Sequence, residues 1–428
     1  LGGRADLMMI LDGRCRGGTI GEAMKTARRN AAVMWLAALV VTWAAGESRA
    51  DDWPQWRGPN RDGISKETGW LAQWPQGGPK VLWRADVGAG YSSFAVVGGR
   101  VYTMGNADKN DTVFCLSADT GEIVWRKSYP CGAGEHPGTY ATPTVDGKVV
   151  YTLSREGHLL ALDTASGKPI WGKHLPNDFG AKPERWGFAC SPLVLGDRLI
   201  LDAGATLAIN KQTGALVWKS GEDKAGYSSP TVFEVGGKTL LAVFPEFGPI
   251  LRQAADGKEL ARLRWDTIYG PNVATPIVQG NRVFFSSGYD KGCVLLELGG
   301  SGFKEIYQNK NMRNHANSCI LWEGHLYGFD GQVGGGGKLA CLDFQTGERK
   351  WEQGGLGTGS LMLADGKLII ISERGDLVVA EASPAAYREL ARAKVLEKTC
   401  LTMPVLSGGR IYCRNHEGKI VCVDVRAK

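Results

Sequence analysis

The sequence lacks the short motifs by which several common enzyme classes are recognised. Its 428 residues contain no H-E-x-x-H, G-x-S-x-G, phosphate-binding P-loop, G-x-G-x-x-G or haem-attaching C-x-x-C-H motif. The six histidines fall in separate segments without metal-ligand spacing. None of the ten cysteines is adjacent to another, and no C-x-x-C pair occurs. We therefore assign no catalytic residue and no metal ligand from motifs.

The charge balance and the apolar runs exclude two further classes. Lys and Arg number 50 and Asp and Glu 44, a net charge of +6, which falls to +3 past residue 50. Such a balance implies no basic face, so we expect no nucleic-acid partner. The apolar run at 31–45 has 15 residues, whereas a membrane-spanning helix needs about 20. We expect no transmembrane span in the mature chain.

Residues 24–50 instead predict an export signal. A basic stretch begins at Met24 and precedes the apolar run, and the small residues Ser48 and Ala50 stand at positions −3 and −1 of a cleavage site. We expect cleavage near Ala50, so that the mature chain begins at Asp51 and is periplasmic or secreted. Residues 1–23 are interpreted as upstream read-through, which places 1–50 outside the mature protein.

What is abundant is glycine, with 60 residues against 18 prolines and no G-X-Y period. Glycine at this level indicates many tight turns. Four segments share a strand, a turn with glycine, and a second strand that ends on tryptophan: 114–125, 160–171, 207–218 and 340–351. Eight copies of a hairpin pattern accompany them, at 91–105, 140–154, 190–204, 227–244, 273–288, 316–331, 358–375 and 401–418.

The spacing of these units predicts the fold. Successive aromatic residues at the end of each unit are 42 to 47 residues apart: Trp83, Trp125, Trp171, Trp218, Trp265, Tyr307 and Trp351. Four strands per unit at this period are typical of propeller blades. We predict an all-β, eight-bladed propeller of four-stranded antiparallel blades over 80–428. We assign Trp83, Trp125, Trp171, Trp218 and Trp351 to packing between neighbouring blades.

The two ends of the repeat region predict how the ring closes. The last unit stops at 419–425 after three strands, while 80–87 resembles an isolated fourth strand. We expect 80–87 to complete the last blade, which would join the two ends and leave no broken ring for other chains to pair with. Residues 51–79 form an irregular N-terminal arm with Trp53, Trp56, Trp70 and Trp74. The arm is expected to lie on the propeller, with partner binding as the alternative.

The repeats resemble a known family. The unit L-x-A-L-D-x-x-T-G-x-x-x-W is similar to the pyrroloquinoline-quinone (PQQ) repeat of quinoprotein alcohol dehydrogenases, which the outer-membrane assembly lipoprotein of the barrel-insertion machinery shares. The resemblance covers about 51–428 and implies the propeller fold. Quinoprotein dehydrogenases hold PQQ over a vicinal disulfide, with a stacked Trp, a Ca²⁺ bound by carboxylate and amide groups, and an Asp as base. This chain has no adjacent cysteine pair, so that platform is missing.

The cysteines are interpreted as packing residues. Nine remain past residue 50, an odd number that leaves at least one without a partner inside the chain. Cys115, Cys341 and Cys422 occupy one slot of the repeated strand, where other copies have Ala161 and Ala208. Cysteine in such a slot behaves as a small buried apolar residue. Metal or redox chemistry is the alternative.

Candidate ligand-binding residues lie in the loops that enter the innermost strands, because these loops rim one face of a propeller. Such loops are 131–140, 177–189, 266–272 and 309–317. Their polar and aromatic residues are the groups that a small-ligand funnel needs: Glu135, His136, Arg185, Trp186, Tyr269, Asn272, Arg313, Asn314 and His315. Two alternatives remain: ordinary solvated loops, or a Ca²⁺ site made by Asn272 with Glu135, Asp178 or Glu184.

These features predict an exported, non-catalytic binding or scaffold propeller. We expect it to be a monomer without a cofactor that engages an envelope protein or glycan through its loop-lined face. The alternative is a PQQ-dependent dehydrogenase that uses PQQ with calcium to oxidise an alcohol or sugar. A third reading is a lyase or hydrolase that uses the propeller only as a frame.

Overall fold

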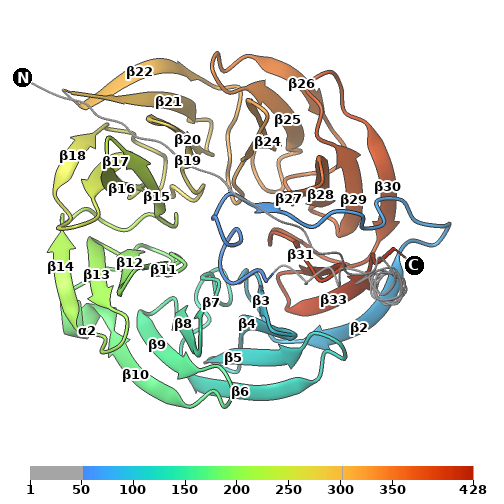
Figure 1. The fold of residues 1–428 in the computed structure, drawn as a ribbon, viewed down its shortest axis with the longest axis horizontal. Coiled ribbons are helices and arrows are strands. Elements are labelled where there is room, and N and C mark those ends of the chain that lie inside the picture. Colours follow the sequence, from blue (N-terminus) through green and yellow to red (C-terminus); the bar gives the residue numbers. More distant parts are fainter. Residues whose placement is uncertain (1–51, 301, 428) are drawn as a thin grey trace, which may run out of the picture. The chain divides into compact units, whose positions relative to one another are not determined.

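The computed structural model describes residues 52–300 and 302–427. The predicted export signal, its cleavage site and the upstream segment lie outside these residues. The described strands form eight sheets around a common axis, which confirms the predicted eight-bladed β-propeller (Figure 1). The described residues supply no helical segment with the length and hydropathy of a membrane span.

The first four blades follow the chain from the innermost to the outermost strand. Blade 1 is β3 (Ala95–Val97), β4 (Arg100–Ala107), β5 (Asn110–Ser117) and β6 (Ile123–Pro130). Blade 2 is β7 (Thr144–Asp146), β8 (Val149–Leu153), β9 (His158–Asp163) and β10 (Pro169–His174). The short helix α2 (Leu175–Phe179) leads to blade 3, with β11 (Leu193–Leu195), β12 (Arg198–Asp202), β13 (Thr206–Asn210) and β14 (Leu216–Ser220). Blade 4 is β15 (Thr231–Val235), β16 (Lys238–Val243), β17 (Ile250–Gln253) and β18 (Glu259–Arg262).

The other four blades include the two that involve the N-terminal segment. Blade 5 is β19 (Ile277–Gln279), β20 (Arg282–Ser287), β21 (Gly292–Gly299) and β22 (Gly302–Asn309). Blade 6 is β23 (Ile320–Trp322), β24 (His325–Asp330), β25 (Lys338–Asp343) and β26 (Arg349–Gln353). Blade 7 is β27 (Ser360–Ala364), β28 (Lys367–Ile371), β29 (Asp376–Glu381) and β30 (Glu389–Lys394), with β1 (Ile64–Ser65) added parallel to β27. Blade 8 is β31 (Val405–Ser407), β32 (Arg410–Arg414), β33 (Lys419–Asp424) and β2 (Lys80–Asp86).

The ring closes through blade 8 as predicted. Strand β2 pairs antiparallel with β33, and Trp83 stands opposite Cys422. The N-terminal strand thus supplies the outermost strand of the last blade, and no blade is left with three strands. Closure of this kind covers the edge of β33, which would otherwise be free to pair with another chain.

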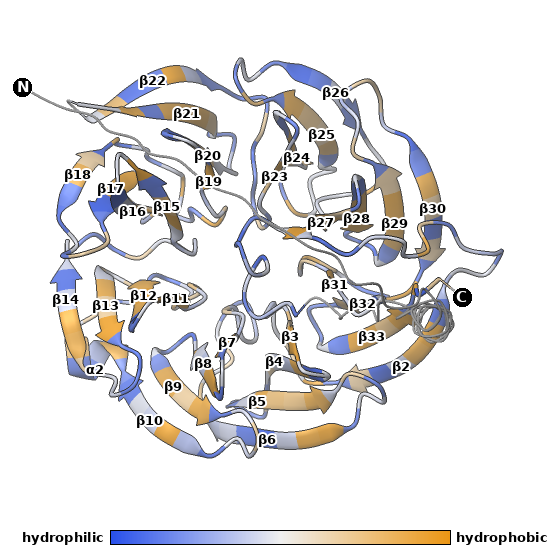
Figure 2. Ribbon diagram, in the orientation of Figure 1, coloured by the Kyte–Doolittle hydropathy of each residue, from blue (hydrophilic) through white to orange (hydrophobic). Residues whose placement is uncertain are grey.

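The hydrophobic core lies in the inner strands of neighbouring blades. Strands β5, β21 and β29 are strongly hydrophobic over much of their length (Figure 2), and Cys115, Leu295 and Val379 within them are fully buried. The outermost strands alternate between partly buried and exposed residues, as in β26. The core is therefore a series of layers between blades, which is the arrangement expected of a propeller.

The repeated tryptophan of one blade lies against the glycine turn of the next. Gly167 has a φ of 67°, and a side chain there would collide with the ring of Trp125. The indole N–H of Trp125 donates to the carbonyl of Thr164 in the same turn, at 2.9 Å. The same ring-on-glycine contact joins Trp83 to Gly121, Trp171 to Gly214, and Trp218 to Gly257. Each such T-G-x-x-x-W repeat therefore takes part in two interblade contacts. Its glycine contacts the tryptophan of the preceding blade, and its tryptophan contacts the glycine of the next blade.

Replacing Trp125 with alanine is expected to lower the free energy of unfolding by about 3–5 kcal/mol, because a large buried ring is lost from the interface between blades 1 and 2. Trp125 is only 8% exposed, whereas its neighbour Val124 is 45% exposed. The matched control Val124→Ala should change stability by less than about 0.5 kcal/mol. Denaturant unfolding of both variants measures the difference. Equal free energies would contradict the packing role.

The N-terminal arm runs into the middle of the ring rather than along its outside. In Figure 1 the blue segment after residue 50 lies at the centre of the propeller. Trp53 exchanges two backbone hydrogen bonds with Val96 of blade 1, and the carbonyl of Pro54 accepts from Val145 of blade 2. Trp53 is buried, and its neighbour Trp56 is partly buried. The arm therefore occupies the central channel and contacts blades 1 and 2 there.

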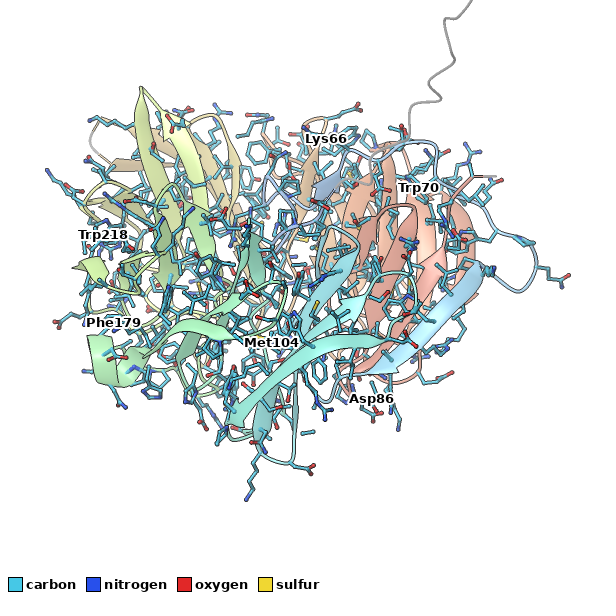
Figure 3. All side chains as sticks on the ribbon, turned by 60° about the horizontal axis from the view of Figure 1, so that its bottom comes forward. Lys66, Trp70, Asp86, Met104, Phe179 and Trp218 are labelled. Atoms are coloured by element: carbon cyan, nitrogen blue, oxygen red, sulfur yellow. The ribbon has the colours of Figure 1, made fainter. Side chains whose placement is uncertain are left out.

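The rest of the arm passes over blades 7 and 8. Figure 3 labels Lys66 and Trp70 beside the orange and red blades. Trp70 is buried and lies 5.9 Å from the ammonium of Lys367 in blade 7, measured to the ring centroid. Trp74 is partly buried against the same core. The four tryptophans thus find contacts on the propeller itself.

Candidate functional site

A cavity of about 420 Å³ lies where the central channel meets the loops that enter the blades. Trp56 of the arm lines it, together with residues from most of the blades. Trp56 is held there by a 2.9 Å hydrogen bond from its indole N–H to the hydroxyl of Thr275. The arm therefore contributes part of the wall of the site, and the repeats contribute most of the rest.

The repeats supply the wall from one equivalent position in seven of the eight blades. Hydroxyl side chains near the start of neighbouring blades accept hydrogen bonds from the backbone of the preceding blade: Ser93 N–H donates to Thr142, Thr142 N–H to Ser191, and Ser191 N–H to Ser229, each at 2.9–3.0 Å. The residue two places before each hydroxyl position faces the cavity. These residues and their equivalents in the other blades are Tyr91, Tyr140, Ala189, Tyr227, Val273, Ala316 and Leu401.

Aromatic rings dominate one side of the wall. Tyr91 and Tyr140 stack with centroids 5.8 Å apart and an interplanar angle of 25°. The ring of Trp186 lies 5.6 Å from that of Tyr227, and 5.1 Å from His136 in an edge-on contact. Rings that contact one another in this way lose little conformational entropy when a ligand binds.

Burial favours the uncharged forms of His315 and of the tyrosines that line the cavity. Burial, with a smaller contribution from His136, lowers the pKa of His315 below its usual value. Burial raises the pKa of Tyr140 to about 12, and it also raises the pKa of Tyr227. The cavity is therefore largely aromatic and suits an apolar or planar group.

Three of the nine predicted site residues line the cavity: His136, Trp186 and His315. Glu135 and Arg185 lie beside them as an ion pair of 3.3 Å. Glu135 also accepts a hydrogen bond from the indole N–H of Trp186, at 3.2 Å. These two charged residues thus orient Trp186 and do not themselves line the cavity.

The other four predicted residues have different positions. Asn272 and Asn314 are buried, and their amides donate to backbone carbonyls of Pro245 and Phe329, at 2.7 and 3.0 Å. Arg313 pairs with Asp330 at 2.8 Å and lines a separate, polar cavity. Tyr269 is 62% exposed and contacts Tyr289, which lines the main cavity. Buried amides at these positions hold loops in place and are not available to a ligand.

The oxygen atoms considered for calcium have separate partners. Glu135 pairs with Arg185, and Glu184 lies 3.8 Å from the ammonium of Lys224. Asp178 accepts a hydrogen bond from the backbone N–H of His174 at the start of α2. Their interactions therefore give no support to a shared calcium site.

The residues that sequence analysis missed are the tyrosines of the repeat itself: Tyr91, Tyr140, Tyr227 and, from a loop, Tyr289. A signal for three of them was present. Tyr91, Tyr140 and Tyr227 are the first residues of their hairpin copies, and an aromatic residue at the mouth of an innermost strand faces the axis. No sequence signal pointed to Trp56, because the arm is outside the repeat.

The described lining does not fit PQQ with calcium. PQQ carries carboxylate groups that cationic side chains bind, and Ca²⁺ requires several oxygen ligands that usually include carboxylates. The part of the lining that the structure describes contains no Asp, Glu, Lys or Arg. The nine described cysteines are buried thiols. The described lining therefore supplies no carboxylate, ammonium or guanidinium group for the ionic contacts that this cofactor makes.

Comparison with known proteins gives two groups of relatives. Residues matched to a quinoprotein ethanol dehydrogenase of Pseudomonas aeruginosa are 31% identical over 170 residues, 36% of this chain and only 26% of that protein. An outer membrane protein assembly factor BamB of Moranella endobia is 22% identical over 333 residues, 71% of this chain and 79% of that protein.

Solved structures of both groups share the fold. The quinohemoprotein alcohol dehydrogenase of Comamonas testosteroni superposes with a TM-score of 0.66 at 14% identity, over 88% of this chain and 81% of that one. BamB of Moraxella catarrhalis superposes with a TM-score of 0.58 at 14% identity, over 83% of this chain and 99% of that one. The family described as outer membrane protein assembly factor BamB matches residues 69–137 and 133–353. This chain belongs to that family of PQQ-repeat propellers.

Proposed function

We propose that the protein is an exported, non-catalytic binding propeller that holds an envelope protein through its loop-lined face. The observation that carries this proposal is the composition of the cavity wall, which combines tryptophan and tyrosine rings with hydroxyls and has no charged carboxylate, ammonium or guanidinium group among its described residues. Pockets of this composition accept the apolar side chains by which protein partners are anchored. Kinship with an outer membrane protein assembly factor supports a partner of the envelope.

Export remains part of the same proposal. It rests on the signal pattern at 24–50, with cleavage after Ala50. A glycan is the alternative occupant on the same face, because aromatic walls also stack on sugar rings. We propose a monomer for either occupant, since β2 covers the edge of β33 with which a second copy could otherwise pair.

The second candidate function is a PQQ-dependent dehydrogenase that oxidises an alcohol or sugar. The match with the quinoprotein ethanol dehydrogenase favours it, and the absence of ionic groups in the described lining disfavours it. Purified protein mixed with PQQ and Ca²⁺ separates the two functions. Dye reduction with an alcohol or sugar would support the dehydrogenase, whereas neither cofactor absorbance nor dye reduction is expected for the binding propeller.

Photo-crosslinking tests the binding function in the cells that export the protein. A photoreactive phenylalanine analogue placed at Trp186 or Tyr140 should capture one envelope protein, because both residues line the cavity. The same analogue at Val124, exposed on the outermost strand of blade 1, is the control. Capture of nothing at the cavity, or of the same protein at Val124, would contradict the proposal.

Affinity for the captured protein then tests the cavity itself. Trp186→Ala should weaken binding by at least about tenfold, as truncation of an interface hot spot does, and should leave the melting temperature near that of the unchanged protein. Val217→Ala, which truncates an exposed side chain on β14, should change neither quantity. Unchanged affinity in Trp186→Ala would place the binding surface elsewhere.

A further inference from the structure

A second group of ligand atoms lies where blade 1 meets blade 2. Cys131 follows β6 of blade 1, while Glu156 lies in the turn before β9 of blade 2 and His158 begins β9. The thiol sulphur, a carboxylate oxygen and a ring nitrogen of these residues all lie within 4.8 Å of one another. None of the three lines either cavity described above.

Two of the three side chains, Glu156 and His158, are held in place by hydrogen-bond partners. The carboxylate of Glu156 accepts a 2.9 Å hydrogen bond from the backbone N–H of Gly132. The Nδ1 atom of His158 lies 3.1 Å from the hydroxyl of Ser154. A ring nitrogen fixed in this way by a neighbouring group is typical of histidines that bind metal ions, because the contact sets the tautomer and the ring orientation.

Three buried polar atoms beside this group have no hydrogen-bond partner: Oδ2 of Asp111, the hydroxyl of Tyr129 and Nδ1 of His174. Asp111 is fully buried, and its other oxygen accepts from Asn106, whose amide also donates to the carbonyl of Cys131. The ring of His158 lies 5.3 Å from that of Tyr129 and 4.9 Å from that of His174. Buried polar atoms are rarely left unpartnered, so the unpartnered atoms of Tyr129 and His174 beside His158 indicate an occupant that supplies charge or hydrogen bonds.

The charges around the group favour a cation. The carboxylates of Asp111 and Glu156 both lie near the thiol of Cys131. Arg155 is the basic side chain beside the group, and its guanidinium donates to the carbonyls of Gly132 and Trp186. It therefore does not neutralise the two carboxylates through a direct contact.

We propose that Cys131, Glu156 and His158 bind a divalent metal ion of the zinc class. A thiolate, an imidazole and a carboxylate together suit Zn²⁺, and water takes the fourth position in sites with three protein ligands. Metal–ligand bonds of about 2.0–2.3 Å place tetrahedral ligands about 3.3–3.8 Å apart, so the three atoms need to approach by about 1 Å. On binding, the thiol of Cys131 releases its proton to solvent as the sulphur–metal bond forms.

The metal site would affect the candidate binding face through the loop that connects the two. Cys131 is the first residue of the loop 131–140, which carries His136 and Tyr140 to the main cavity. A metal at Cys131 would fix the beginning of that loop against blade 2. Metal binding at this contact between two blades is independent of what the cavity binds, because none of the three ligands lines the cavity.

Cobalt and zinc are the probes that test this site in the mature protein. We expect one equivalent of Co²⁺ to bind with a near-ultraviolet sulphur-to-cobalt absorption band, and one equivalent of Zn²⁺ to displace it and raise the melting temperature. Glu156 is exposed, so Glu156→Gln should fold normally and weaken Co²⁺ binding by at least about tenfold. Cys131→Ser should abolish the absorption band.

A matched control separates this thiol from the other buried cysteines. Cys115→Ala removes a thiol from a slot that holds Ala161 and Ala208 in blades 2 and 3, and it should keep both the band and the stoichiometry. Absence of the band in the unchanged protein would overturn the proposal. So would its survival in Cys131→Ser, or unchanged affinity in folded Glu156→Gln.

Discussion

Deletion of residues 51–87 is expected to abolish cooperative thermal unfolding, whereas deletion of 51–78 should leave a closed ring of lower melting temperature. The longer deletion removes β2, and with it the pairing to β33 and the ring of Trp83 against the glycine turn of blade 1. Loss of that tryptophan alone costs about 3–5 kcal/mol, and whole domains are stable by only about 5–15 kcal/mol. The exposed edge of β33 should also promote association.

The shorter deletion is the control for losing the arm without opening the ring. It removes buried Trp53 and Trp70 and empties the central channel, but all four strands of blade 8 remain. Circular dichroism gives the melting curves, and light scattering after size exclusion gives the oligomeric state. If the two truncations have the same melting temperature and the same oligomeric state, β2 contributes nothing beyond the arm.

The blades and their closure were predictable because they depend on a local, repeated pattern. Segment 80–87 has the Trp of a fourth strand without three strands before it, and the C-terminal unit has three strands without a fourth. Trp265 was the exception in the repeat. It lies beyond β18, and its indole N–H donates to Ser287 of blade 5. The position that Trp218 occupies in blade 3, opposite Ala208, is occupied in blade 4 by Ala261, opposite Leu251.

The cavity was less predictable because its wall depends on direction and on contacts outside the repeat. Loop composition pointed to Asn272 and Asn314, but both amides turn inward to backbone carbonyls. Trp56 reaches the cavity only because the arm enters the channel, which no periodicity indicates. Cys131 and His158 likewise meet only when blade 1 packs on blade 2, so their separation in sequence showed no ligand spacing.

Replacement of Arg57 by alanine is expected to lower the free energy of unfolding by about 3–5 kcal/mol. Arg57 is 1% exposed at the centre of the ring. Its guanidinium donates to the carbonyls of Arg61, Asp62 and Cys319, at 3.0, 2.8 and 2.7 Å. Burial lowers its pKa to about 10, so it stays protonated at neutral pH. The last of these bonds joins the arm to blade 6, and truncation would leave buried carbonyls without donors.

Alanine is the informative replacement because it retains Cβ. Arg57 has a φ of 62°, and alanine has the same backbone strain at this φ. The measured loss of unfolding free energy therefore comes from removing the guanidinium and not from a change in backbone strain. Lys66→Ala, in an exposed part of the same arm, should change stability by less than about 0.5 kcal/mol. If Arg57→Ala unfolds at the same denaturant concentration as Lys66→Ala, the arm does not tie the blades together. If Arg57→Ala loses much of its free energy of unfolding while Lys66→Ala does not, the arm is part of the structural core of the propeller.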